Sequence, residues 1–259
     1  MPLFLNLPVF SILAAALGLV LGSFYSVCVT RYLDGGSIIY PPSHCPLCNR
    51  RLRAWELLPI VSYLFLRGRC AGCGHRISVL YPLIELTSAV WAVLAAQATG
   101  PSLWFLAYLA LGGLFIVASA IDFKAYLLPD ILTYPAAVLG LVMGALRPDI
   151  GPLGAAIGAA CGFGLFWLLA TLYRLAKGVD GLGGGDVKLM LSIGGAVGWM
   201  GLPYAILIGS LAALLASPFY VLGKGRGRTM PIPFGPFLCC GALIQLLYGP
   251  VFLRLLASH

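Results

Sequence analysis

Charge is scarce in this sequence, and negative charge is the scarcer: 8 Asp and Glu stand against 16 Lys and Arg among 259 residues. Charged residues make up 9% of the chain, whereas a soluble domain carries about 25%. Hydrophobic residues account for 61%, and the mean hydropathy is +0.99. This composition excludes an ordinary soluble domain and predicts an integral membrane protein.

Two further absences narrow the class of protein. Residues Met1–Asn6 contain no Lys or Arg, and the first basic residue, Arg31, follows the first apolar run. A cleaved export signal has its positive charge before that run, so we expect a retained membrane helix. No GxGxxG motif lies between a strand and a helix, which excludes a soluble dinucleotide-type cofactor fold.

Eight apolar runs are long enough, as helices, to cross about 30 Å of hydrocarbon. The expected fold is therefore an all-α polytopic membrane protein of about eight transmembrane helices. Only Gly201 and its neighbours separate the short, glycine-rich sixth run from the seventh, so seven or nine spans also fit the sequence. The runs are Val9–Val29, Leu80–Ala98, Leu103–Ile121, Ile131–Leu146, Leu153–Tyr173, Val187–Met200, Leu202–Leu222 and Ile232–Leu256.

The distribution of Lys and Arg predicts the orientation of these spans. If the first run leads into the cytoplasm, 14 of the 16 basic residues are cytoplasmic and only Arg147 and Arg254 lie outside. Cytoplasmic loops carry this excess of positive charge, and both termini then face outward. The net charge of +8 is not evidence for a nucleic-acid partner. The positive-inside bias explains the excess of Lys and Arg, and anionic phospholipid headgroups can attract it. We therefore expect no nucleic-acid partner.

The one long extramembrane segment, Thr30–Val79, contains two CxxC pairs, Cys45 with Cys48 and Cys70 with Cys73, separated by 21 residues. This spacing is typical of a four-thiolate zinc site. Disulfides, a redox CxxC and plain buried thiols are the competing interpretations. Cytoplasmic placement argues against disulfides, and the presence of two pairs argues against a single redox motif.

Zinc would also explain how so short a loop folds, since about 50 residues bury too little apolar surface to fold on their own. His44 and His75 flank the cysteine pairs and are expected to be bystanders. Between the pairs, an apolar stretch over residues 57–65 predicts a helix or hairpin packed on the zinc turns or on the membrane surface.

Two carboxyl groups, Asp122 and Asp186, stand at the same, cytoplasmic end of long apolar segments. A charge at the edge of the hydrocarbon costs roughly 2.5–3.5 kcal/mol or more, so such residues are functional candidates. Asp122 opposes the dipole of the helix it ends, whereas Asp186 would also serve as a helix cap. The glycines before Asp186 allow close backbone approach. The pair predicts acid–base hydrolysis in a membrane, provided that the fold brings the two together.

Two other acids have different explanations. Asp130 follows Pro129 at the start of a span and is expected to cap that helix. Glu85 lies one turn inside the second span, where a carboxylate needs a partner.

The chain resembles the type IV prepilin peptidases, which are bifunctional enzymes that act as leader peptidases and as N-methyltransferases. The matching blocks run through the whole chain in order. They are Gly22-Ser23-Phe24 with Arg31, CPLC…RGRCAGCG in the loop, YPLIEL at 81–86, Ile121-Asp122 leading to Leu128-Pro129-Asp130, GGGDVKLM at 183–190 and IPFGP at 232–236.

The resemblance implies an aspartic endopeptidase of the GxGD type, with Asp186 in that motif and Asp122 as its partner. Such enzymes cut prepilins or pseudopilins after a glycine that ends a basic leader, at the cytoplasmic face of the bacterial inner membrane. They then methylate the new N-terminal amine with S-adenosylmethionine. Because this chain keeps the cysteine loop, the bifunctional form is implied.

The expected domains are a first transmembrane helix (1–29), a zinc-binding, methyltransferase-associated loop (30–79) and a seven-helix peptidase core (80–259). Substrate positioning is assigned to Gly183, Gly185, Lys124 and Lys188, although a positive-inside role also explains the lysines. The candidate residues for binding S-adenosylmethionine are Glu56, Arg67, Gly68 and Arg69, and a solvated basic face is the alternative.

Two other functions fit the same residues less well. A different GxGD intramembrane protease without methyltransferase activity does not explain the cysteine loop or IPFGP. A non-enzymatic zinc-bearing scaffold or transporter does not need the aspartate pair. The sequence indicates neither the oligomeric state nor which pilin is the substrate.

Overall fold

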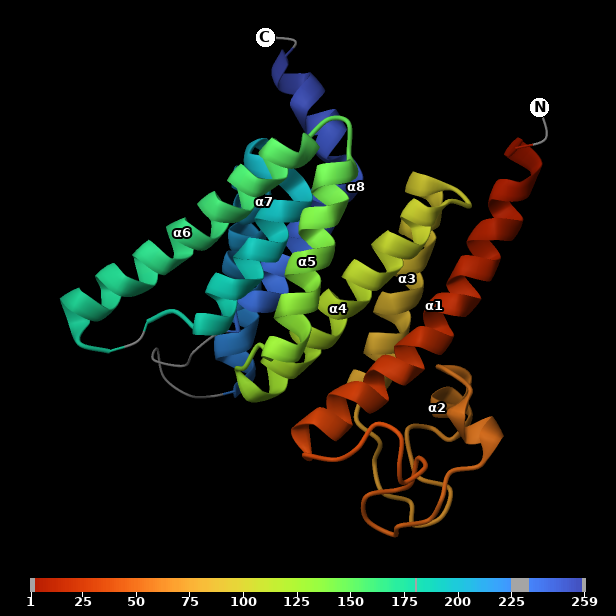
Figure 1. Ribbon diagram of the computed structural model, residues 1–259. Coiled ribbons are helices and arrows are strands. Elements are labelled where there is room, and N and C mark those ends of the chain that lie inside the picture. Colours follow the sequence, from red (N-terminus) through yellow and green to blue (C-terminus); the bar gives the residue numbers. More distant parts are fainter. Residues whose placement is uncertain (1–2, 180, 225–232, 258–259) are drawn as a thin grey trace. The chain divides into compact units, whose positions relative to one another are not determined.

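The computed structural model describes residues 3–179, 181–224 and 233–257, and within them the chain is helical, with only two isolated β-bridges (Figure 1). The all-α prediction is confirmed. Ile232, the first residue of the expected eighth span, lies outside the described residues. The helices are α1 (Leu3–Leu33), η1 (Ala54–Leu57), α2 (Val61–Phe65), α3 (Leu80–Thr99), α4 (Leu103–Ala125), α5 (Asp130–Leu146), α6 (Gly151–Lys177), α7 (Gly184–Lys224) and α8 (Gly235–Ala257).

Five helices, α1, α3, α4, α6 and α7, are long and apolar enough to cross a membrane, which supports a multi-pass membrane protein. Two shorter apolar segments among the described residues are α5 and the part of α8 over Gly235–Gly249. The expected sixth and seventh spans are two helical segments that follow each other within α7. The break between them lies three residues before the expected Gly201, where the backbone angles are not helical, at Gly198. Its φ of 71° suits a residue without a Cβ atom, so the chain kinks there and continues.

The chain divides into two compact units, Met1–Ala120 and Ile121–His259, and the boundary falls near the end of α4. This division differs from the domains expected from the sequence, because α3 and most of α4 belong to the first unit. Both aspartates lie in the second unit and all four paired cysteines in the first.

In the first unit, α1 packs along α3 through small residues, as helices do in lipid. A methyl group on Gly22 of α1 would lie 2.6 Å from the Cα atom of Glu85 on α3. The indole N–H of Trp91 on α3 donates to the carbonyl of Tyr108 on α4 (2.9 Å), and the two rings stack. These contacts hold the helices from which the loop over residues 34–79 emerges.

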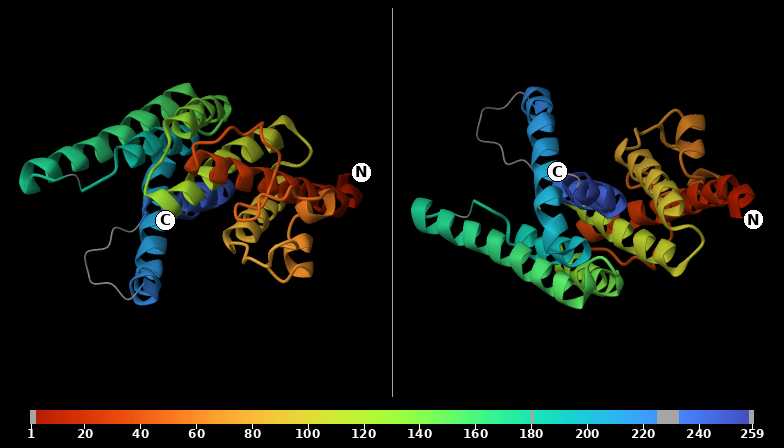
Figure 2. Two further views of the ribbon diagram at one scale, coloured as in Figure 1. Left: turned by 90° about the horizontal axis from the view of Figure 1, so that it is seen from below. Right: turned by 90° about the horizontal axis from the view of Figure 1, so that it is seen from above.

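In the second unit, α7 packs against α5, α6 and α8, and Figure 2 shows α6 lying along α7. Glycine makes the contact between α6 and α7 possible. A methyl group on Gly158 of α6 would overlap the carbonyl of Gly194 and lie 2.8 Å from the backbone nitrogen of Trp199. The Ser192 hydroxyl donates to the Ala136 carbonyl (2.7 Å) and joins α7 to α5.

The glycine contact can be tested with a matched pair on one helix. Gly158→Ala should lower thermal stability in detergent, because the new Cβ pushes α7 away; overpacking of this kind costs about 1–3 kcal/mol. Gly164→Ala is the control, since nothing lies within 4 Å of a Cβ there and alanine is the better helix former by about 0.5–1 kcal/mol. Equal melting temperatures for the two variants would contradict this packing.

Candidate functional site

Asp122 lies in the last turn of α4 and is buried, with 6% of its surface exposed. The helix ends because Tyr126 takes a positive φ of 54°, and Leu128 and Pro129 lead directly into α5. The carboxylate accepts a hydrogen bond from the backbone N–H of Gly235, where α8 begins. The N-terminus of a helix carries partial positive charge, so α8 supports a negative charge on Asp122.

Asp186 is the third residue of α7 and is also buried, with 9% of its surface exposed. Its backbone N–H donates to the carbonyl of Gly183 (3.1 Å). Its Oδ1 atom is buried without a hydrogen-bond partner among the described residues. A buried carboxyl oxygen with no partner is costly in a purely structural position, which marks Asp186 as a candidate for chemistry.

Leu128 brings the two aspartates into one site. A methyl group on Gly185 would lie 2.6 Å from its Cβ atom, and one on Gly235 would lie 3.0 Å from its Cδ1 atom and 2.8 Å from Oδ2 of Asp122. Glycine at both positions lets α7 and α8 close on the turn between α4 and α5. The carboxylates of Asp122 and Asp186 are then near enough to repel each other.

The two lysines beside this pair differ in their surroundings. Lys188 donates to Asp130 (2.6 Å) and lies over the ring of Tyr134, so its charge is already matched. Asp130 does not cap α5 as expected. The cap is Pro129, and the side chain of Asp130 makes no capping hydrogen bond. Lys124 is exposed in the last turn of α4, where a cation complements the helix dipole.

In the first unit the four paired cysteines come together, and their sulfur atoms all lie within 4.8 Å of one another. The Sγ atoms of Cys45 and Cys73 are 3.8 Å apart. That is far beyond a disulfide bond of about 2.05 Å. It equals the separation of about 3.8 Å between sulfurs at tetrahedral corners 2.3 Å from a zinc ion. The set fits zinc, and neither His44 nor His75 joins it.

The two cysteine turns repeat the same hydrogen bonds. The Cys45 N–H donates to Arg50 and the Asn49 N–H to Cys45, while the Cys70 N–H donates to His75 and the Gly74 N–H to Cys70. Asn49 and Gly74 both have positive φ. Each turn therefore supplies one half of the four-cysteine cluster.

Backbone amides favour the thiolate forms that a metal requires. The N–H groups of Cys48 and Leu47 lower the pKa of Cys45. Those of Cys73 and Gly72 lower the pKa of Cys70 to about 6. The His75 amide lowers the pKa of Cys73, but burial and the three other sulfurs outweigh it and raise that pKa to about 11. Four thiolates repel one another strongly, and a dication would remove that repulsion.

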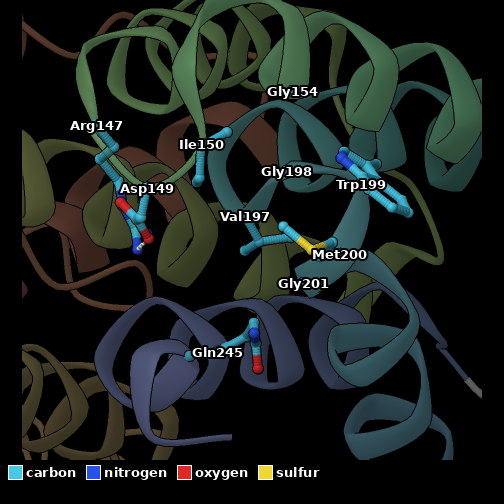
Figure 3. Close-up of a pocket in the computed structure, with 11 residues that line it drawn as sticks. Arg147, Asp149, Ile150, Gly154, Val197, Gly198, Trp199, Met200, Gly201 and Gln245 are labelled. Carbon is cyan, nitrogen blue, oxygen red and sulfur yellow. Dashed lines mark hydrogen bonds and ion pairs between the residues drawn. The ribbon is translucent and has the colours of Figure 1, made fainter. Parts of the chain in front are cut away.

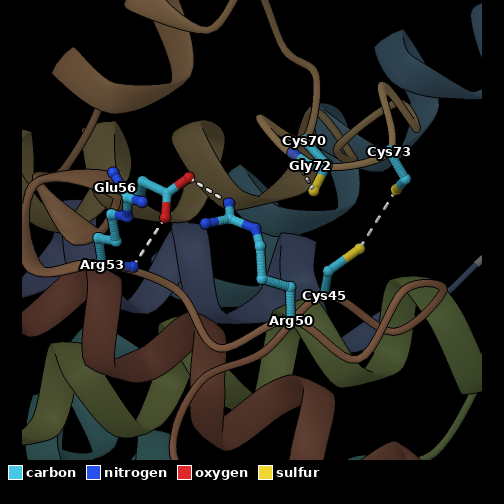
Figure 4. A network of polar contacts seen from close by, with 7 residues as sticks. All are labelled: Cys45, Arg50, Arg53, Glu56, Cys70, Gly72 and Cys73. Carbon is cyan, nitrogen blue, oxygen red and sulfur yellow. Dashed lines mark hydrogen bonds and ion pairs between the residues drawn. The ribbon is translucent and has the colours of Figure 1, made fainter.

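Arg50 links this cluster to Glu56 (Figure 4). Its guanidinium forms an ion pair of 2.5 Å with Glu56, whose second carboxylate oxygen accepts the backbone N–H of Arg53 at 2.7 Å. The hydrogen bond from Arg50 holds the pKa of Glu56 below its usual range. Arg50 also interacts with the sulfur of Cys70. Glu56 is thus fully engaged inside the loop, and Arg50 places one positive charge between Glu56 and the cysteine cluster.

The other candidates for cofactor binding lie on the turn after α2. Gly68 is buried with a φ of 67°, its carbonyl accepts the Ile77 N–H at 2.8 Å, and a methyl group on it would lie 2.9 Å from the hydroxyl oxygen of Tyr63. Gly68 therefore has a structural reason to be glycine. Arg67 and Arg69 on either side are exposed.

Glu85, whose partner the sequence left open, binds the loop. Its Oε2 atom accepts the backbone N–H of Ile60 at 2.8 Å, and the Ser23 side chain on α1 adds a second hydrogen bond. Ile60 immediately precedes α2 and has a positive φ of 58°. The position of Glu85 inside a span indicated that its carboxylate needs a partner. No sequence pattern could identify that partner, because it is a backbone N–H group.

A separate hollow of about 30 Å³ lies where α7 kinks, and its lining includes Arg147, Asp149, Gly198 and Gln245 (Figure 3). Arg147 and Asp149 form an ion pair of 2.6 Å. A hollow of this size holds one or two water molecules. None of the predicted site residues lines it.

The cysteine site leads to two expectations about metal content. The purified protein should contain about one zinc per chain by elemental analysis, and Cys45→Ser with Cys48→Ser should contain none. Metal-free protein isolated under reducing conditions, with its loop folded, would contradict the assignment.

Arg50→Gln should weaken zinc binding by about tenfold or more, because outer contacts of metal ligands typically contribute that much. The readout is competition with a chromogenic chelator. Arg51→Gln is the matched control, since Arg51 is the exposed neighbour. Equal zinc affinity in the two variants would show that Arg50 does not support the cluster.

Two family models match most of the chain. Residues 16–99 match the bacterial peptidase A24 N-terminal domain, and residues 109–217 match the type IV leader peptidase family. A protein of Burkholderia pseudomallei (strain K96243) is 37% identical over 95% of this chain and 87% of its own length. Relatives from Aeromonas salmonicida (strain A449) and Pseudomonas putida are 38% and 34% identical over 84% and 93% of this chain, and over 75% and 91% of their own lengths. Each of the three is described as a prepilin leader peptidase/N-methyltransferase. No solved structure matched. The chain belongs to the type IV leader peptidase family.

Proposed function

We propose that this chain cleaves the leader peptide of type IV prepilins or type II secretion pseudopilins and then N-methylates the new N-terminus. One observation carries the proposal. Two buried carboxyl groups from distant parts of the sequence, Asp122 and Asp186, meet in the second unit, and one of them has an oxygen without a partner. The descriptions of the relatives favour the bifunctional enzyme over a protease alone.

The aspartate pair shares one proton, because two like charges this close disfavour double ionisation. We place that proton on Asp186. Asp122 is supported as a carboxylate by the Gly235 N–H and the start of α8, whereas Oδ1 of Asp186 has no donor within the described residues.

Cleavage then follows from proton transfers between the pair and the substrate. Asp122 removes a proton from a water molecule as the water oxygen bonds to the scissile carbonyl carbon. Asp186 gives its proton to the carbonyl oxygen. As the carbon–nitrogen bond breaks, Asp122 protonates the leaving amine and Asp186 takes back the proton from the new carboxyl group. The pair returns to its starting state.

The glycine run offers the substrate a place beside the pair. Nothing lies within 4 Å of a Cβ on Gly184, whereas Gly185 packs on Leu128 and a methyl group on Gly183 would lie 3.3 Å from Oδ2 of Asp186. A peptide segment must be extended for its peptide bond to be attacked. Because Gly183 and Gly185 have no side chains, they leave room for such a segment beside the aspartates. Lys124 is available for an acidic residue of the mature segment. Lys188 can do the same only by leaving Asp130.

The finer topology also belongs to the proposal. The chain crosses the bacterial inner membrane about eight times, and its active site and loop face the cytoplasm. The apolar helices support it, and this topology would place 14 of the 16 basic residues on the cytoplasmic side, as the positive-inside rule expects. The functional division is the first helix (1–29), the loop (30–79) and the peptidase core (80–259).

We assign the loop to methyl transfer, with Cys45, Cys48, Cys70 and Cys73 holding a structural zinc ion. S-adenosylmethionine, when bound, supplies the methyl group. Arg67 and Arg69 are exposed beside Gly68 and can bind its carboxylate. Glu56 is occupied by Arg50, so its part is to hold the loop together.

Asp122→Asn and Asp186→Asn should each reduce cleavage of a purified prepilin to less than a few per cent, because the two carboxyls act as a unit. Mass spectrometry of the product N-terminus measures this. Asp130→Asn is the control carboxyl, exposed and paired with Lys188. Both active-site variants should still methylate a peptide whose leader is already absent. A folded variant that cleaves well would remove its aspartate from the pair.

Gly185→Ala and Gly184→Ala test the packing of the glycine run. The first should lower both the melting temperature and cleavage, since its methyl group meets Leu128. The second should keep the melting temperature of the parent, because its methyl group meets nothing. Equal melting temperatures would show that Leu128 does not set the position of α7.

A further inference from the structure

Apolar side chains gather on the outside of the cysteine loop, over η1 and α2. We call them the α2 face. Leu64 and Phe65 are 68% and 77% exposed, and the rings of Trp55 and Phe65 meet edge to face with centroids 6.1 Å apart. A patch of this kind outside the spans marks an interaction site. The face comprises Trp55, Leu57, Leu58, Val61, Leu64 and Phe65.

Glu85 sets the level of this face along the membrane helices. It lies five residues after the start of α3, about 7 Å along the helix axis. The hydrogen bond that it accepts from the Ile60 N–H holds the residue just before α2 beside that turn. Figure 1 shows α2 next to the end of α3 that the loop joins. The α2 face therefore lies where α3 enters the bilayer and not out in the cytoplasm.

Charge on the flanks of the segment matches an anionic surface. Arg53 precedes η1 and Arg67 follows α2, and both are exposed. The only charged residue between them is Glu56, which is buried against Arg50. Basic flanks around an apolar face with an aromatic ring are typical of segments that lie in the plane of the membrane interface.

We propose that the α2 face is embedded in the headgroup layer of an anionic phospholipid bilayer, as an in-plane anchor that holds the cysteine loop on the membrane. Glu85 is the positioning residue that sets its depth. The anchor is independent of cleavage and methyl transfer, because it requires neither substrate nor methyl donor.

The test uses the full chain in nanodiscs without substrate. The photoreactive residue p-benzoylphenylalanine replaces Leu64 in one protein and Leu47 in another, and intact mass spectrometry measures lipid adducts. Leu47 is the matched control, since it is 63% exposed but lies on the cysteine turn. We expect at least fivefold more phosphatidylglycerol adduct at 64 than at 47, and less adduct at 64 when all lipid is zwitterionic.

Glu85→Ala should reduce the yield of lipid adduct at position 64. If that variant folds poorly, the comparison of positions 64 and 47 in the protein with Glu85 intact still tests the proposal. Equal yields at 64 and 47 would overturn the proposal. So would loss of the lipid adduct at 64 when a prepilin is added, because the α2 face would then be a substrate surface. Cleavage is not measured, so failure here leaves the proposed function untouched.

Discussion

The structure depends on one constraint: in hydrocarbon a polar group must find its partner within the chain. Asp122 finds a backbone amide at the start of α8, Glu85 finds the amide of Ile60, and Ser192 finds the carbonyl of Ala136. Each of these bonds joins segments that are distant in sequence. These bonds therefore fix how the helices meet. Among the described residues, Oδ1 of Asp186 is buried without a partner, as are Oγ of Ser88, Oγ1 of Thr133 and Oε1 of Gln245.

Glycine is the second feature on which the helix packing depends. In lipid, burial of apolar surface does not drive helices together, so they associate through close approach of their backbones, which glycine allows. Gly22, Gly158, Gly185 and Gly235 each stand where a methyl group would meet a neighbouring segment. Two of them border the aspartates. The lack of a side chain that packs the helices also lets α7 and α8 approach Leu128 beside Asp122, so helix packing and the surroundings of the aspartates depend on the same positions.

Much of the fold and of the candidate site could be predicted from the sequence. The remainder could not, and the reasons are physical. Apolar runs predicted most helices, and the CxxC spacing predicted which thiols would meet. The glycines at 198 and 201 both fit a break between two helical segments, so the sequence predicted the break in α7 but placed it at Gly201 instead of Gly198. The partners of Glu85 and Asp122 are backbone amides, which every residue but proline carries and no motif marks. The ion pair between Lys188 and Asp130 joins two different helices, and sequence spacing does not predict contacts between residues of different helices.

The two cysteine turns, with their repeated hydrogen bonds, have a consequence for the order of synthesis. Cys73, the last metal ligand, precedes Leu80, where α3 begins. All four cysteines are therefore synthesised before α3 and before Glu85. The hydrogen bonds that close the two turns join residues within 45–50 and within 70–75, so neither turn requires a residue of a later helix in order to form. The two turns are local folding units, whereas the attachment of the loop to Glu85 must wait until α3 exists.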